Sequence, residues 1–552
     1  MAAVADAFDP YEPRPTLWQR HPQLGWVLAV FGFTVFLTYI SFPPVSTGEA
    51  AYVLALPALL WAYRRPSFRL FAWTVLGAQA AAWTALLGWL HHVTWVGLGL
   101  LGPFVGLLVG AWFLAAWWAI PRLAGHRALV RILAMLGLAA LWVVLEWFRS
   151  VLFGGFPWLP LAASQWQRPL ILQVAAYAGS GATSFILICF NLGAAAYVHR
   201  AFFEGVTGFK KRTPEFSVAL LVLMGGSFPF LADTFNQQRR PLVRAALVQP
   251  YIPQNEKWDA ARASEVLHTI ENVTLDAARR GAPQLIIWPE AVTPWALYRD
   301  PNVRDWLESM ARRTKRPLLL GSVFTRGGGR PDELWYNGAF VVDPGKGLDP
   351  AGYAKRKLVP FGEYIPLRAV LGWIDKFAPI GGDFQRGTEA APLQVPAGSR
   401  RVPVGVLICY EDIFPGLARE SALAGAEVLA VLTNNGWFGE GGAAYQHAAH
   451  SVLRAIETRR PVIRCGNGGW SGWIDEFGNT RAVLQDGNGS VYFRGAQTLE
   501  VTRDMRWAGK QSYYTQNGDW FLLACVGLAA VAYYVVLMMR APRPEPDGKT
   551  VF

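Results

Sequence analysis

The chain is poor in charged residues and in cysteine for its length. Only 16% of its 552 residues are charged, whereas 53% are hydrophobic. A soluble protein of this size carries more charge, so part of the surface is expected to face lipid. The four cysteines, at positions 189, 409, 465 and 525, form neither a disulfide framework nor a zinc-binding spacing. The composition therefore excludes a wholly soluble protein and a small disulfide-stapled one.

Long apolar runs predict a multi-pass membrane protein. Most of them approach the ~20 apolar residues that a spanning helix needs. The eight runs lie at about 24–42, 49–63, 68–90, 93–120, 129–148, 170–198, 215–232 and 519–538. The run at 49–63 is the shortest. No small-residue cleavage site follows the first run, so we expect it to be retained and not removed as a signal peptide.

The basic residues predict the orientation of these helices. With a cytoplasmic N-terminus, thirteen Lys and Arg lie in the inner loops and tail, against Arg149 and Arg168 in the short outer loops. We therefore expect residues 1–234 to form a membrane domain of seven helices and residues 235–515 to form a periplasmic catalytic domain. Residues 516–552 form the eighth helix and a cytoplasmic tail. Much of the positive charge behind the net value of +12 then lies in the cytoplasmic loops and tail, where it sets the orientation of the helices. No nucleic-acid partner is therefore expected.

Between the membrane segments the pattern changes to alternating short strands and amphipathic helices. This alternation predicts an α/β domain. The expected strands are 245–248, 285–288, 318–323, 404–408, 428–432 and 462–464, and the expected helices are 256–280, 302–314, 413–425 and 444–459.

Three residues of this domain could carry covalent acyl transfer. Cys409 follows a strand, where a nucleophile is exposed to ligands, and its thiol needs a base or a nearby cation for activation. Glu290 follows Ile-Ile-Trp-Pro, which would desolvate it and raise its pKa toward that of a useful base. Lys355 could stabilise an oxyanion, although spacing alone does not choose between it, Arg356 and Lys357.

Several of these polar residues also have simpler interpretations. Cys409 could be an inert buried cysteine, or could form a disulfide with Cys465. Neighbouring His447 and His450 suggest a Ser-His hydrolase, but no Gly-x-Ser-x-Gly elbow accompanies them, and we expect His447 to pack or cap. Glu146 and Arg149 are either an interfacial ion pair or part of a membrane-facing floor of the active site.

The motifs, taken together, resemble the nitrilase superfamily, whose signature is Glu, Lys and Cys in this order. With eight membrane helices around the domain, the chain is similar to the apolipoprotein N-acyltransferase family. The most specific matches are Trp288-Pro289-Glu290, the stretch Lys355 to Pro366 and Cys409-Tyr410-Glu411. Further matches are Pro253 to Trp258, Asn434 to Gly439, Gln446-His447 and Gly155 to Trp158.

The resemblance implies a four-layer αββα sandwich and a catalytic triad of Glu290, Lys355 and Cys409. It also implies a phospholipid acyl donor, an apolipoprotein acceptor and the bacterial inner membrane as location, without metal or cofactor; we expect the chain to act as a monomer. The site-supporting residues that it implies are Glu363, Tyr410, Glu411 and Trp258. Departures from the family pattern are Asn435 in place of Asp, Lys357 in place of a common His, and Gly466 to Trp470.

A loop over residues 359–386 is rich in large apolar side chains. We interpret it as a lid that opens toward the membrane and flexes near Gly381-Gly382; a packed long loop is the alternative. The lid residues are Phe361, Tyr364, Trp373 and Phe377. Two rival functions remain: a membrane-tethered amidase that hydrolyses C–N bonds, and a transporter or scaffold with a degenerate outer domain.

Overall fold

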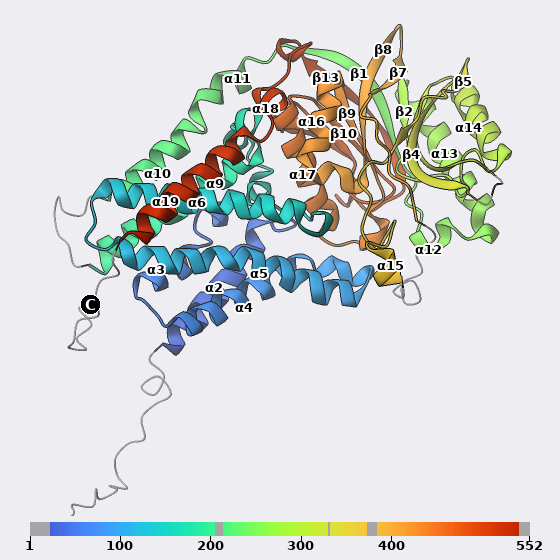
Figure 1. Cartoon of the computed structure of the whole chain (residues 1–552). Helices are drawn as coiled ribbons and strands as arrows, with labels where there is room; N and C mark the ends of the chain where they lie inside the picture. Colours follow the sequence, from blue (N-terminus) through green and yellow to red (C-terminus); the bar gives the residue numbers. More distant parts are fainter. Residues whose placement is uncertain (1–22, 205–212, 329, 331, 373–382, 540–552) are drawn as a thin grey trace, which may run out of the picture.

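The computed structural model describes residues 23–204, 213–328, 330, 332–372 and 383–539. Figure 1 shows the long helices on one side and two β-sheets on the other, with α19 (red) running back beside the N-terminal helices. The principal helices of this region are α2 (Leu24–Ser41), α3 (Leu56–Tyr63), α4 (Phe68–Leu86), α5 (Trp95–Ala119), α6 (Ala128–Val151), α9 (Ser180–Phe202), α10 (Pro214–Gly225) and α19 (Trp520–Leu537).

Six helical segments of the described chain are long and apolar enough to cross a membrane. They are Leu24–Ser41, Trp95–Leu123, Ala128–Gly154, Ser180–Phe202, Pro214–Phe235 and Trp520–Leu537. The expected run at 49–63 is a short apolar helix, Gly48–Tyr63, and α4 is not among the six. Since α4 contains Arg69 and Gln79, it is less apolar than its neighbours. By length and composition, the structure therefore supports six of the eight predicted membrane-spanning helices.

Two of the expected runs are interrupted. The run at 170–198 comprises α7 (Pro169–Leu172), α8 (Ala175–Ala178) and then α9. Gly179 separates α8 from α9, and its φ of +72° is a conformation that glycine adopts without strain. The run at 215–232 ends as α10 at Gly225 and continues after a turn as α11 (Leu231–Phe235). Glycine and proline at these points break the helices that hydropathy alone predicts to be continuous.

The α/β unit contains two mixed sheets. In the first, the order is β13-β1-β2-β3-β4-β5, with β6 on β4; in the second, it is β12-β11-β10-β9-β8-β7. The strands are β1 (Arg239–Gln249), β2 (Leu285–Ile287), β3 (Leu318–Arg326), β4 (Leu334–Asp343), β5 (Gly347–Leu348), β6 (Tyr353–Ala354), β7 (Leu393–Ala397), β8 (Arg400–Ile408), β9 (Val428–Thr433), β10 (Val462–Gly466), β11 (Gly472–Ile474), β12 (Thr480–Val483) and β13 (Gly495–Asp504). The central strands of each sheet are parallel, so their carboxyl ends lie at one edge.

The two sheets pack face to face, and helices cover both outer faces. Leu247 and Ile287 of the first sheet share a core with Val406 and Ile408 of the second. Helices α13 (Ala263–Gly281) and α14 (Pro301–Thr314) cover the outer face of the first sheet. Helices α16 (Pro415–Leu423) and α17 (Ala443–Thr458) cover that of the second. The layers therefore run helices, sheet, sheet, helices.

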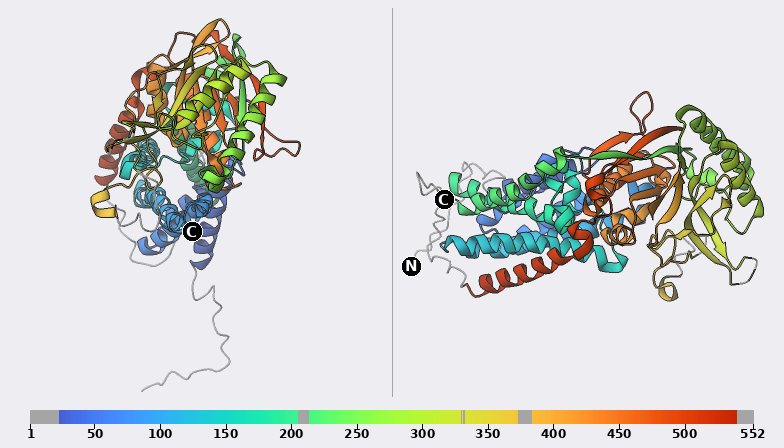
Figure 2. Two further views of the ribbon diagram at one scale, coloured as in Figure 1. Left: turned by 90° about the vertical axis from the view of Figure 1, so that its right-hand side faces the viewer. Right: turned by 90° about the horizontal axis from the view of Figure 1, so that it is seen from above.

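Helix α17 joins the α/β unit to the helical region. Its side chains share one hydrophobic cluster with strands of the second sheet and with the membrane-side helices, so it is covered on both sides. Gln446 makes the main polar contact: its Oε1 accepts from Nε1 of Trp89 and of Trp158 at 2.9 and 2.8 Å. Its Nε2 donates to the carbonyls of Pro43 and Leu86 at 3.1 and 2.9 Å. The right-hand view of Figure 2 shows the same end-to-end arrangement of helices and sheets from above.

Candidate active site

The three residues singled out from the sequence meet at the sheet edge. Glu290 follows β2, Lys355 follows β6 and Cys409 follows β8, and all three side chains are buried. Lys355 Nζ lies 3.2 Å from Glu290 Oε1 and 2.8 Å from Glu363 Oε1. Asn337 Nδ2 donates to the same two oxygens at 2.8 and 3.1 Å. Of the three basic residues in this segment, Lys355 is thus the one that faces these carboxylates, and Glu363 contacts it directly.

The electrostatics of Glu290 differ from the sequence-based expectation. Burial by itself raises its pKa, as expected from the preceding apolar residues. The attraction of Lys355, the hydrogen bond from Asn337 and the charge of Lys257 together outweigh burial and lower the pKa below its ordinary value of 4.5. The expectation of a raised pKa is therefore wrong, because the sequence does not show which cations fold against the carboxylate. Glu290 is an ionised base at neutral pH.

Cys409 is a neutral thiol in this environment. Burial, followed by the negative charge of Glu290, raises its pKa to about 12, although Lys355 acts in the opposite direction. A thiol of this kind must lose its proton to a base as it attacks. Its backbone φ is +50°, a conformation that non-glycine residues rarely adopt and that recurs at functional sites. All four cysteines are free, so the Cys409–Cys465 disulfide is not formed.

Glu411 connects the segment around Cys409 with the segment around Lys355 through hydrogen bonds. Its side chain is fully buried. One oxygen accepts from the backbone N–H groups of Arg356 and Lys357 at 2.6 and 3.1 Å. The other accepts from the backbone N–H of Ile408 at 2.7 Å and from the Tyr353 hydroxyl at 2.7 Å. Glu411 therefore fixes the end of β8, just before Cys409, to the segment that carries Lys355.

A buried polar network lies behind Cys409, and sequence reasoning missed its role. His447 Nε2 lies 3.1 Å from the Cys409 carbonyl and 2.7 Å from Asp412 Oδ1, and its Nδ1 lies 3.2 Å from Asn435 Oδ1. Arg464 contacts the other oxygen of Asp412. Burial opposes ionisation, yet His447 and Arg464 hold the pKa of Asp412 well below its ordinary value. The network holds the backbone carbonyl of Cys409 through His447, and Asn435 contacts the other ring nitrogen of this histidine.

Lys257 is a further cation that sequence reasoning missed. It ends the short helix α12 (Gln254–Lys257), and its side chain is 2% exposed. Its Nζ donates to the backbone carbonyl of Glu290 at 3.2 Å. The only sequence signal was its place beside Trp258, which the family motif nominated. Trp258 itself is half-exposed, with its ring 5.7 Å from the Lys257 ammonium.

The lid residues are described only in part. Phe361 is largely exposed, and its backbone N–H donates to the Tyr364 carbonyl at 2.8 Å, which closes a tight turn. Arg386 lies 5.1 Å from the centre of the Tyr364 ring. Trp373, Phe377 and the Gly381-Gly382 hinge lie outside the described residues. The lid therefore remains a prediction.

The loop at 152–161 contacts the back of the nucleophile segment. The Tyr410 hydroxyl donates to the Gly155 carbonyl at 2.7 Å, and the Trp158 ring centre lies 5.6 Å from that of His447. These contacts join the loop at 152–161 to the segment that carries Cys409; a floor formed by Glu146 and Arg149 stays a prediction.

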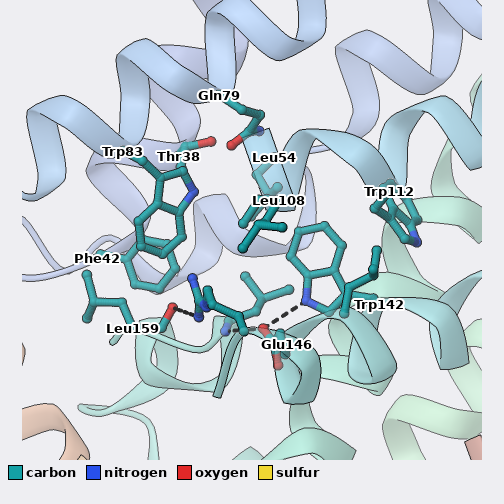
Figure 3. Close-up of a pocket in the computed structure, with 14 residues that line it drawn as sticks. Thr38, Phe42, Leu54, Gln79, Trp83, Leu108, Trp112, Trp142, Glu146 and Leu159 are labelled. Carbon is teal, nitrogen blue, oxygen red and sulfur yellow. Dashed lines mark hydrogen bonds between the residues drawn. The ribbon is translucent and has the colours of Figure 1, made fainter. Parts of the chain in front are cut away.

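A cavity of about 30 Å³ lies below this loop, among α2, α4, α5 and α6. Figure 3 shows Gln79 and Glu146 among the residues that line it. Glu146 Oε1 accepts from Trp142 Nε1 at 2.8 Å and from the Leu161 N–H at 2.7 Å. Arg149 Nη2 donates to the Leu159 carbonyl at 3.4 Å. The expected Glu146–Arg149 ion pair is not present among the described residues.

Comparison with known proteins identifies the family. Residues 244–501 match the carbon-nitrogen hydrolase family, and residues 34–193 match the apolipoprotein N-acyltransferase N-terminal domain. An apolipoprotein N-acyltransferase of Geobacter metallireducens is 31% identical over 533 residues, which cover 92% of this chain and 95% of the relative. The chain belongs to the apolipoprotein N-acyltransferase family. Another member of the family, from Chlorobaculum tepidum, is 28% identical and covers 92% of this chain and 96% of its own length.

Solved structures of an amidase resemble about half of this chain. An amidase from Nesterenkonia sp. is 19% identical, with a TM-score of 0.36, over 51% of this chain and 95% of the amidase. The protein is thus an acyltransferase-family enzyme with a nitrilase-like C-terminal part and an N-terminal helical region.

Proposed function

We propose that this enzyme transfers a fatty acyl chain from a phospholipid to apolipoproteins through a thioester on Cys409. The acceptor is the N-terminal amine of the diacylglyceryl-cysteine, and the proposed donor is the sn-1 chain of phosphatidylethanolamine. One observation carries the proposal: in a chain of this family, a buried Glu290–Lys355 pair 3.2 Å apart lies close enough to the buried Cys409 thiol for both charges to influence its pKa.

The first step forms the acyl-enzyme. The Glu290 carboxylate takes the Cys409 proton as the sulfur bonds to the ester carbonyl carbon. Lys355 and the Tyr410 backbone N–H stabilise the oxyanion, because preorganised donors in a buried site cost little reorganisation. The ester C–O bond then breaks, and the leaving oxygen takes the proton from Glu290, which releases a lysophospholipid.

The second step transfers the chain to the amine. The amine nitrogen bonds to the thioester carbonyl carbon while Glu290 takes its proton. The C–S bond breaks, and the sulfur receives that proton back, which leaves an amide product and the resting thiol. One nucleophile thereby serves an ester donor and an amine acceptor. Glu363, held 2.8 Å from Lys355, keeps this lysine ammonium in place during both steps.

The amidase alternative is less well supported. An enzyme for soluble amides has no need of a helical region that buries α17 and donates two indole N–H groups to Gln446. The degenerate-scaffold alternative also fits poorly, since Lys355 and Asn337 each contact both Glu290 and the partly buried Glu363.

We also propose that eight helices cross the inner membrane and that residues 235–515 lie in the periplasm, between a domain at 1–234 and a final helix and tail at 516–552. The excess of basic residues in the inner loops supports this orientation. A reporter that is active only outside the cytoplasm, fused near residue 240, is expected to give signal. Activity of a cytoplasmic reporter at that junction, with a silent periplasmic one, would overturn the topology.

Intact mass spectrometry tests the reaction. After incubation with phosphatidylethanolamine, the wild-type protein is expected to gain the mass of one acyl chain, and Cys409→Ala is expected to gain none. Cys465→Ala is the matched control: its thiol is also buried, but it donates to the backbone carbonyls of Val248 and Ile287 between the sheets. Acylation of Cys409→Ala, or loss of acylation in Cys465→Ala alone, would refute the assignment of the nucleophile.

A further inference from the structure

Lys257 is a buried ammonium with no carboxylate hydrogen-bonded to it in the described part of the chain. Among the described residues its ammonium, which has three donors, makes one hydrogen bond, to the backbone carbonyl of Glu290. A buried charge with so few partners is costly, so its retention in a site calls for a compensating role. The negative groups that act on it are the Glu290 carboxylate and, when ionised, the Cys409 sulfur.

The position of Lys257 is fixed by contacts between distant segments. Asn467 accepts from the Ile252 N–H at 3.1 Å and donates to the Ile252 carbonyl at 2.8 Å. Two residues later, Gln254 Oε1 accepts from Asn434 Nδ2 at 2.7 Å. Asn434 directly follows Thr433, whose side chain contacts the Cys409 thiol. Helix α12 is therefore held beside the nucleophile, and Lys257 has little freedom to turn away.

The charges around the thiol explain why a second cation is present. Glu290 and Glu363 contribute two carboxylates, and Lys355 neutralises only one of them. Acyl-enzyme formation then develops new negative charge on the sulfur and on the carbonyl oxygen. Without Lys257 the cluster would carry a net negative charge before the reaction starts, which disfavours that new charge.

We propose that Lys257 is a positioning residue for acyl-enzyme formation: its ammonium balances the second carboxylate and fixes the backbone of Glu290 toward the thiol. The inference rests on the proposed thioester mechanism. It assigns to α12 a part in the chemistry, beyond the three residues of the triad and the second glutamate.

The pH dependence separates this role from simple packing. Burial lowers the pKa of Lys257 to about 8, although Glu290 acts to raise it. Lys355 stays charged in this range, because Glu290 and Glu363 outweigh burial and hold its pKa well above the ordinary value. The Cys409 thiol, with a pKa of about 12, also does not titrate near pH 8. A decline in rate centred near pH 8 therefore reports on Lys257 within this cluster.

The experiment is a rapid-quench measurement of acyl-Cys409 by intact mass, on the full chain in detergent with phosphatidylethanolamine, from pH 6 to pH 10. Wild type is expected to slow as the pH rises through about 8. Lys257→Met is expected to form acyl-enzyme about 10²-fold more slowly at pH 7, comparable to the loss of one oxyanion donor, without the decline near pH 8. Lys257→Arg keeps the charge and is expected to stay active at pH 9. Lys510→Met, at an exposed lysine, is the matched control.

Each outcome bears on one hypothesis. A Lys257→Met variant that acylates at the wild-type rate, or that is slow but still declines near pH 8, overturns the inference. If Lys257→Met does not fold, a Lys257→Arg profile that still declines near pH 8 overturns it equally. Failure of wild type to form acyl-Cys409 at any pH refutes the proposed function instead, whatever the Lys257 variants do.

Discussion

Replacing Glu411 by glutamine is the sharpest test of how the site is assembled. The two carboxylate oxygens accept four hydrogen bonds, from the N–H groups of Ile408, Arg356 and Lys357 and from the Tyr353 hydroxyl. The glutamine amide has nearly the same shape, but its NH₂ group must face at least one of these donors. An unsatisfied buried donor costs about 1–3 kcal/mol, and hydrogen bonds to a charged group are worth about 1.5–3 kcal/mol.

We therefore expect Glu411→Gln to lose about 2–4 kcal/mol of the free energy that holds the Lys355 segment against the Cys409 loop. If that loss appears in the barrier, acyl-enzyme formation slows by roughly 30- to 1000-fold, since 1.36 kcal/mol corresponds to tenfold in rate. Formation of acyl-Cys409 is measured by intact mass, and secondary structure by circular dichroism.

Glu420→Gln is the matched control. Glu420 also contacts Arg356, at the guanidinium group of the arginine. The Glu420 side chain is 52% exposed, and surface ion pairs contribute little to stability. This variant is expected to acylate within about twofold of wild type. Equal rates for Glu411→Gln and Glu420→Gln would refute the view that Glu411 positions the two segments.

Three further predictions follow from the same contacts. Glu290→Gln and Lys355→Ala are each expected to lower acyl-enzyme formation by about 10²-fold or more; normal acyl-Cys409 in either mass spectrum would contradict its first-step role. Because the pKa of Glu290 lies below 4.5 and a base acts only when deprotonated, the rate should hold from pH 7 to pH 5 and fall below pH 4.5; an acid limb centred at pH 6 would contradict this. Gln446→Leu removes four hydrogen bonds, each worth about 1 kcal/mol, and should increase amide hydrogen exchange in α17; unchanged exchange would show that apolar packing alone holds the domains together.

Local patterns were sufficient to predict much of the α/β unit. All six expected strands fall within observed strands or extend one by a single residue, because short apolar runs and the turns that bound them are local properties. The expected helices at 302–314 and 444–459 match α14 and α17 within about one residue. Strands β4, β5, β6, β7, β11, β12 and β13 lie outside the six expected strands. Several of them pair antiparallel at sheet edges, where partial exposure weakens the apolar signal.

Tertiary structure decided the electrostatics of the site. The sequence shows the apolar residues before Glu290, and from these a raised pKa is the reasonable expectation. The fold adds Lys355 and Asn337, 65 and 47 residues away, and the pKa falls. Charge interactions depend on distances of a few ångströms, which a linear sequence does not contain.

The sequence by itself determined the membrane character and the alternation of strands and helices, and it singled out Glu290 and Cys409 as candidates, since hydropathy and short motifs are local properties. Only the tertiary structure decided how these groups are held. His447 contacts the Cys409 carbonyl across 38 residues, and Lys257 reaches Glu290 across 33. Such contacts form when the two sheets close on each other, and only then do a carboxylate, two ammonium groups and a thiol share one water-poor site.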